Sequence, residues 1–194
     1  MTVFLFILSV LANPIGQKAP DFKLVDTEGT VHQLSQYEGK VVVLEWFNPG
    51  CPFVKYVHDK GVMAKNYERF TNDKVKSEAS VVWLAVNSGA SGKQGAGLKA
   101  SQKAREKWAL SYPVLLDETG QVGKLYGAKT TPQMFVVDQK GVLVYAGALD
   151  NAPMGKSSEK EVSYLKEALD SVLDGVPVEL PQTKPYGCSV KYAQ

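Results

Sequence analysis

The amino-acid sequence predicts an α/β protein built around one mixed sheet that is flanked by helices. Strand-like apolar runs alternate with segments of helical spacing through most of the chain, as in parallel strands joined by helices. The last two strand-like runs are separated only by a short turn and are followed by a final helix. Such a hairpin requires antiparallel pairing, so the sheet is expected to combine both kinds of pairing.

The first elements are a hairpin and a central strand. Residues 22–25 and 31–34, turned at Gly29, are predicted to pair as a short hairpin. Residues 41–47 are apolar except for Glu45, which is typical of a strand covered on both faces.

The later elements follow from the same periodicities and from Gly and Pro positions. They are a helix at 51–70 with a break at Gly61, a buried strand at 79–86, a helix at 98–110, a strand at 112–116, a short helix at 122–126, a hairpin at 134–137 and 142–146, a helix at 159–173, and a Pro-rich irregular tail at 176–194.

Composition limits the classes of function. The length of 194 residues suggests one domain with a sizeable core, here placed at residues 16–175. Twenty-two basic and 20 acidic residues leave a net charge of +2, which excludes a nucleic-acid partner. Two cysteines, Cys51 and Cys188, are too few for a disulfide scaffold and too far apart for a compact zinc knuckle. Redox chemistry, catalysis or burial remain for them, and no metal or organic cofactor is expected.

The first twelve residues form an apolar stretch that is too short to span a bilayer. It fits the hydrophobic region of a signal peptide, with small residues Val10 and Ala12 at the expected cleavage site. The positively charged segment that normally precedes this region is missing, because the first lysine is Lys18. We therefore expect residues 1–12 to be a signal peptide of an exported, periplasmic protein that is not an integral membrane protein. The alternative is a buried N-terminal strand in a cytoplasmic protein.

Cys51 lies where the strand at 41–47 gives way to a helix that begins with Pro52. Backbone N–H groups and the positive end of the helix dipole favour a thiolate at such a position, so Cys51 is a candidate nucleophile. Lys55, one helical turn later, either lowers the pKa of Cys51 further or is a solvated lysine on the open face.

Three motifs give the chain a resemblance to the thioredoxin-like superfamily, and more narrowly to its peroxiredoxin-like branch, the alkyl hydroperoxide reductase/thiol-specific antioxidant group. They lie at 19–22 (APDF), 46–52 (WFNPGCP) and 130–138 (TTPQMFVVD), and the similarity covers about residues 16–173. The tail at 183–192 (TKPYGCSVKY) resembles the C-terminal signature of little-characterised single-domain redoxins. The resemblance implies a thioredoxin-like fold.

The resemblance also implies roles for residues around Cys51. Val54 takes the place of the second cysteine of the thioredoxin Cys-x-x-Cys motif, so the usual vicinal disulfide is not available. Thr131-Pro132 matches the cis-proline that offers its backbone to a substrate polypeptide, with a trans turn as the alternative. Thiols and disulfides are therefore favoured as substrates.

Compared with peroxiredoxins, the chain keeps Pro52 but has Asn48 in place of a hydroxyl residue and Pro132 near the position of a supporting Arg. Peroxide reduction needs donors that stabilise the departing oxyanion. A dedicated peroxidase is therefore doubtful, although the Asn48 amide could donate and Lys55 or Arg105 could supply charge.

Glu45 matches the buried acid of thioredoxins and is predicted to move a proton to or from the site; the alternative is a carboxyl at an exposed strand end bonded to a surface lysine. His58 with Cys51 and Cys188 offers a copper site as a further alternative. The glycine-rich loop at 89–95 lacks phosphate-loop spacing and is expected to border the active site.

Cys188 either attacks an oxidised Cys51, as a C-terminal resolving cysteine does, or is a buried residue that anchors the tail. Together these features predict a thiol-based oxidoreductase with Cys51 as nucleophile on protein or small-molecule disulfides, sulfenic acids or hydroperoxides, recycled by an external thiol reductant. The predicted catalytic residues are Cys51, Cys188, Glu45 and Asn48, and the predicted substrate-binding residues are Thr131, Pro132, Pro52 and Lys55. The rival hypothesis is a non-catalytic binding module or a copper-handling protein.

Overall fold

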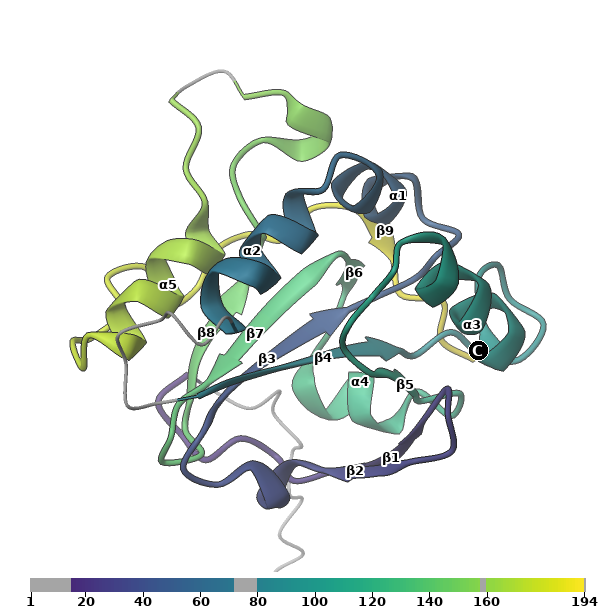
Figure 1. Ribbon diagram of the computed structural model, residues 1–194, viewed down its shortest axis with the longest axis horizontal. Coiled ribbons are helices and arrows are strands. Elements are labelled where there is room, and N and C mark those ends of the chain that lie inside the picture. Colours follow the sequence, from purple (N-terminus) through teal and green to yellow (C-terminus); the bar gives the residue numbers. More distant parts are fainter. Residues whose placement is uncertain (1–14, 72–79, 158–159, 194) are drawn as a thin grey trace, which may run out of the picture.

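The computed structural model describes residues 15–71, 80–157 and 160–193. A seven-stranded mixed sheet runs through the middle of the molecule, with helices on both faces (Figure 1). Its strand order is β2-β1-β5-β4-β3-β7-β8. The strands are β1 Lys23–Asp26, β2 Val31–Gln33, β3 Val41–Trp46, β4 Val81–Asn87, β5 Val114–Leu116, β7 Gln133–Val137 and β8 Leu143–Gly147.

The helices are α1 Pro52–Asp59, α2 Val62–Thr71, α3 Gly97–Lys107, α4 Gln121–Tyr126 and α5 Tyr164–Leu173, with short 3-10 turns η1 Leu34–Tyr37 and η2 Pro153–Gly155. Strand β3 pairs in parallel with β4, and β4 with β5, whereas β3–β7, β7–β8, β1–β5 and β1–β2 are antiparallel. The predicted mixed sheet is confirmed. Among the described residues, the helices are too short or too polar for any of them to cross a membrane.

The central position of β3 follows from its sequence. All six residues of β3 are buried, because alternate side chains enter two different cores. Val41 and Val43 pack under α1, α2, α3 and α5, whereas Leu44 and Trp46 pack under α4 and η1 on the opposite face. Glu45 therefore points into the first core, and the chain that leaves β3 delivers Cys51 to the start of α1.

Most predicted elements are present with shifted ends. The helix expected at 51–70 is divided into α1 and α2 at Gly61, whose positive φ of 68° suits glycine. The strand expected at 112–116 begins only at Val114, and the last helix begins at Tyr164 rather than at 159. Residues 79 and 159, the expected starts of a strand and of that helix, lie outside the described residues.

The tail is more ordered than the sequence indicated. It runs along β8, passes the N-terminal end of α1 and finishes near α3 and α4 (yellow in Figure 1). On the way it forms the short strand β9 Cys188–Ser189, which pairs antiparallel with β6 Thr130–Thr131. A hydrogen bond from Ala146 N to Pro181 O (3.0 Å) and one from Tyr192 Oη to Ala128 O (2.8 Å) fasten its two ends. We call residues 181–192 the strap.

Candidate active site

Cys51 is the N-cap of α1, and Pro52 is the first helical residue. Proline suits this position because its missing N–H would have no partner inside the helix and its φ is already helical. The Cys51 amide is tied back to Asn48 O at 3.0 Å, which closes the turn between β3 and the helix. The Cys51 side chain thus lies at the N-terminal end of α1, where a thiolate is stabilised. It is buried, with only 2% of the residue exposed.

Cys188 lies directly beside Cys51. The two Sγ atoms are 2.7 Å apart, and both residues are free thiols. The pairing of β6 with β9 places Cys188 opposite Thr131, so a residue distant in sequence reaches the start of α1. Of the two roles considered for Cys188, this contact supports a partner for Cys51 rather than a tail anchor alone.

The Thr131–Pro132 peptide bond is cis, so the alternative of a trans turn was wrong. The carbonyl oxygen of Thr131 lies 3.0 Å from Cys51 Sγ. The Thr131 hydroxyl is buried and has no hydrogen-bond partner in the described part of the chain. The segment before Pro132 therefore contacts the reactive sulfur through its backbone and keeps a spare donor nearby.

The two thiols have opposite pKa shifts. Burial alone would raise the pKa of Cys51, but hydrogen bonding from the Cys188 thiol and the Val54 amide lowers it below the ordinary value. Burial and the contact with Cys51 raise the pKa of Cys188 to about 11. Cys51 is therefore the sulfur that ionises first, and the Cys188 S–H donates to it.

Thr131→Val is expected to slow alkylation of Cys51 by iodoacetamide at pH 7 roughly tenfold, because the unpaired Thr131 hydroxyl is available to donate to the thiolate once it forms, and a hydrogen bond to a charged group contributes about 1.5 kcal/mol or more. The wild-type rate should persist as the pH falls below the usual cysteine pKa, since the pKa of Cys51 is lowered. Thr130→Val is the matched control, because that hydroxyl bonds only distantly to Pro132 O (3.4 Å). Equal pH–rate profiles for Thr131→Val and wild type would show that the Thr131 hydroxyl does not support the thiolate.

Glu45 is fully buried, which overturns the alternative of an exposed carboxyl paired with a surface lysine. Its Oε1 lies 2.8 Å from His58 Nε2, and its Oε2 accepts hydrogen bonds from Tyr112 Oη (3.0 Å) and Trp83 Nε1 (3.3 Å). Burial and the neighbouring Glu45 raise the pKa of Tyr112 well above its ordinary value, so its O–H stays a donor. The sequence pointed to Glu45 but gave no signal for Trp83 or Tyr112, because these partners come from different elements.

The copper site considered from the sequence does not form. His58 is engaged by Glu45 and stacks on Trp108 with ring centroids 4.6 Å apart. Within the described ranges, no group of three His, Cys, Asp or Glu side chains could hold a metal ion. Cys51 and Cys188 therefore contact each other, whereas the His58 imidazole contacts Glu45.

Asn48 shapes the turn before Cys51. Its Oδ1 accepts a hydrogen bond from Gly50 N (2.7 Å), and its Nδ2 donates to Gln94 O (3.0 Å). Gln94 Nε2 in turn donates to Gly50 O at 3.2 Å, so the loop at 89–95 borders the site as expected. Gly95 has to be glycine here, because a Cβ would lie 2.0 Å from Asn48 Oδ1. The geometry makes Asn48 a clamp of the turn, and its amide is occupied rather than free to meet a peroxide.

The basic residues considered for the site lie at its margin. Lys55 is exposed and lines a shallow hollow with Lys103 and Lys107. Arg105 forms an ion pair with Glu28, so it is held away as part of α3. Solvation is therefore the better description of Lys55, and Pro52, which follows the buried Cys51, is also exposed.

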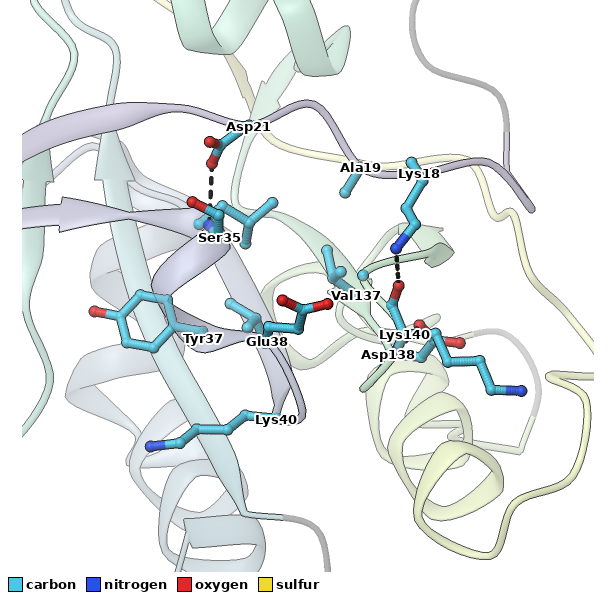
Figure 2. A pocket seen from close by; sticks show the side chains of 13 residues that line it. Lys18, Ala19, Asp21, Ser35, Tyr37, Glu38, Lys40, Val137, Asp138 and Lys140 are labelled. Carbon is cyan, nitrogen blue, oxygen red and sulfur yellow. Dashed lines mark hydrogen bonds between the residues drawn. The ribbon is translucent and has the colours of Figure 1, made fainter.

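A separate pocket of about 180 Å³ lies between the N-terminal segment, η1 and the turn at 138–141 (Figure 2). Within it, Ser35 N donates to Asp21 Oδ1 (3.0 Å) and Lys18 Nζ donates to Lys140 O. Neither cysteine lines this pocket, so the redox site lies elsewhere.

Comparison with known proteins decides the family. The model of the AhpC/TSA family matches residues 15–146. The chain belongs to the AhpC/TSA family. This AhpC/TSA protein is 30% identical over 136 residues to the thiol-disulfide oxidoreductase ResA of Geobacillus kaustophilus, covering 70% of each chain. It is 31% identical over 141 residues to the chloroplastic peroxiredoxin Q of Triticum aestivum, covering 67% of this chain and 57% of that one.

Solved structures with a similar fold match almost the whole AhpC/TSA chain. An uncharacterized conserved protein from Geobacillus kaustophilus matches with a TM-score of 0.77 and 29% identity, covering 93% of both chains. A hypothetical protein from Sinorhizobium meliloti matches with a TM-score of 0.76 and 25% identity, covering 94% of this chain and 97% of that one. The thioredoxin-like fold is confirmed, and the protein is a thiol-dependent oxidoreductase.

Proposed function

We propose that this AhpC/TSA protein is a two-cysteine redox enzyme in which Cys51 is the nucleophile and Cys188 is the second thiol. The observation that carries this proposal is the 2.7 Å contact between their sulfurs. Thioredoxins hold the second thiol one helical turn after the first, but that position is Val54 here. The strap supplies the missing thiol from the other end of the chain.

The site chemistry supports this order of events. The thiolate of Cys51 attacks one sulfur of a disulfide substrate, forming a mixed disulfide and releasing one thiolate. Cys188 then attacks Cys51 Sγ, the bond between Cys51 and the substrate sulfur breaks, and the departing sulfur takes the Cys188 proton, which forms the Cys51–Cys188 disulfide and releases the second substrate thiol. The substrate gains two electrons and the protein loses two, so an external thiol reductant has to restore both cysteines.

Hydroperoxides are the second substrate class. The Cys51 thiolate would attack the terminal oxygen of the hydroperoxide, the O–O bond would break with release of an alcohol or water, and Cys51 would become a sulfenic acid; Cys188 would then attack Cys51 Sγ and displace water to give the same disulfide. Disulfides rank before hydroperoxides, because the Asn48 amide is committed to Gln94 and Pro132 stands where peroxiredoxins carry a supporting Arg. Glu45, which is buried on β3 and bonded to His58, is proposed to take part in proton transfer at this site.

The test is oxidation of reduced protein with one equivalent of cystine or hydrogen peroxide, followed by peptide mapping by mass spectrometry. We expect a Cys51–Cys188 disulfide within one chain, monomeric on non-reducing gels, and none in Cys51→Ser. If Cys51 remains a sulfenic acid or a mixed disulfide with free cysteine while Cys188 stays a thiol, the two-cysteine mechanism is contradicted. A Cys51 that resists both oxidants favours the non-catalytic binding module.

Export is a separate proposal that rests on the sequence alone. The apolar segment at 1–12 lies outside the described residues, so its role as a signal peptide stays a prediction. An exported protein would meet an oxidising compartment, where a dedicated thiol reductant is needed to keep Cys51 and Cys188 reduced. Thiols, disulfides and such a reductant are the proposed partners.

A further inference from the structure

The strap fills the edge next to the cis-proline. Thr130 and Thr131 pair with Ser189 and Cys188, and Val190 N donates to Lys129 O at 3.0 Å. An extended polypeptide that added to β6 would need these same backbone groups. The edge is therefore already occupied by the chain itself, with a cysteine opposite Thr131.

The strap is fastened on both sides of Cys188. On one side, Tyr186 Oη donates to Asp150 Oδ1 at 2.7 Å, and its ring lies 5.9 Å from that of Phe53. On the other side, Ala90 N donates to Lys191 O at 2.8 Å. Cys51 lies beneath this segment and is only 2% exposed, whereas Cys188 is partly exposed. A bulky reagent thus meets the sulfur of Cys188 before that of Cys51.

Building on the proposed function, we propose that external thiols reduce the protein by attacking Cys188, so that Cys188 is the exchange sulfur and Cys51 the buried leaving group. The reductant thiolate forms a bond to Cys188 Sγ, and the Cys51–Cys188 bond breaks. Cys51 departs as a thiolate with the electron pair of that bond. A second thiol of a dithiol reductant then attacks the sulfur that it bound to Cys188, closes its own disulfide and releases Cys188 as a thiolate that takes up a proton.

The chemistry of the two thiols agrees with the access that the strap allows. In thiol–disulfide exchange, the thiol with the lower pKa leaves faster. The pKa of Cys51 is lowered, whereas that of Cys188 is raised to about 11, so attack on Cys188 expels the better leaving group. The strap would thus separate two reactions: small oxidants reach Cys51, and the thiols of larger partners exchange at Cys188.

Gly187 allows the strap to lie this close to the cis-proline. Its φ is 125°, and a Cβ there would be 2.2 Å from Thr131 O and 2.8 Å from Thr131 C. Both contacts are to backbone, which cannot turn aside as a side chain can. Gly187→Ala should therefore lift the strand from the edge while leaving both cysteines in the chain.

The first experiment reads the position of attack directly. Oxidised wild-type protein, shown by mass to contain the Cys51–Cys188 disulfide, is treated briefly with substoichiometric glutathione, quenched with acid, alkylated and mapped. We expect glutathione on Cys188 and the alkyl group on Cys51. The same distribution of the two labels should be obtained when the reaction time is extrapolated to zero. Glutathione on Cys51 overturns the proposal. Failure of the proposed function would be seen earlier, as starting material without the disulfide.

The second experiment tests the shielding by the strap without relying on the disulfide. Reduced Cys188→Ser protein is compared with Cys188→Ser/Gly187→Ala in reaction with a bulky maleimide, which only Cys51 can accept. We expect Cys51 to react about tenfold faster when Gly187 is replaced, because the covering segment then opens locally. Gly175→Ala, which also changes a glycine of positive φ but has open space around it, is the matched control and should not alter the rate. Equal rates in the two test variants overturn the proposal.

Discussion

Cys188→Ser should accumulate Cys51 as a mixed disulfide with cystine and lose catalytic turnover. We expect the wild-type protein to resolve this intermediate, because the second sulfur lies 2.7 Å from the first. Val54, at the position where thioredoxins carry their resolving thiol, cannot attack a disulfide. Serine keeps the size of the Cys188 side chain and removes its nucleophile, so the strap should stay in place.

The expected loss is large. Well-oriented intramolecular groups reach effective concentrations of about 10⁵ M or more, far above any external thiol, so turnover with cystine should fall by roughly a hundredfold or more. The measurement is steady-state reduction of cystine with a dithiol reductant, together with the intact mass of the quenched protein. Cys51→Ser is the control and should show neither turnover nor the mixed disulfide at position 51. A Cys188→Ser protein that turns over at the wild-type rate would contradict the role of Cys188.

Local sequence signals were sufficient to place Cys51, the candidate nucleophile, at a helix N-terminus. The apolar run of β3, the turn that follows it and Pro52 at the first helical position all lie within about a dozen residues. These short-range features fix the backbone at Cys51, and they fix its position at a helix N-terminus. Gly61 likewise marked the break between α1 and α2, because a positive φ favours glycine at that point.

The partner of Cys51 depended on long-range packing that the sequence does not encode in any one segment. Cys188 reaches the site because the strap is held by Pro181, Tyr186 and Tyr192 on three different parts of the domain. Each of these contacts joins residues at least 35 positions apart. Composition alone indicated an irregular tail, and only the pairing of β9 with β6 brings Cys188 of that tail beside Cys51.

The role of Asn48 shows the same limit for a polar residue close to the nucleophile. Its position before Cys51 suggested a donor for a substrate oxygen, since the residue type can donate. Both polar ends of the amide are instead occupied, because Oδ1 accepts from Gly50 N inside the turn and Nδ2 donates to Gln94 O in the neighbouring loop. The residue type shows that Asn48 can donate a hydrogen bond, but the position of the loop at Gln94 determines which acceptor it contacts.

Replacing Glu45 by alanine should cause the greatest loss of stability among single changes near the site. The carboxyl group lies fully buried and joins His58, Trp83 and Tyr112. Its removal leaves polar groups of all three side chains without this acceptor in a region that water does not reach. Breaking a buried polar pair by removing one partner costs about 3–5 kcal/mol, so Glu45→Ala should lower the free energy of unfolding by about that amount.

Urea unfolding at pH 7 measures this loss, with the slope of the transition checked against wild type. Glu45→Gln retains an oxygen acceptor and should lose less, and exposed Glu68→Ala should change stability by no more than about 0.5 kcal/mol. The rate of Cys51 alkylation in Glu45→Gln separates a structural from a proton-handling role, because only the latter changes its pH dependence. A Glu45→Ala protein as stable as Glu68→Ala would show that the three partners find other acceptors, and the buried carboxyl would then have to be retained for its effect on Cys51.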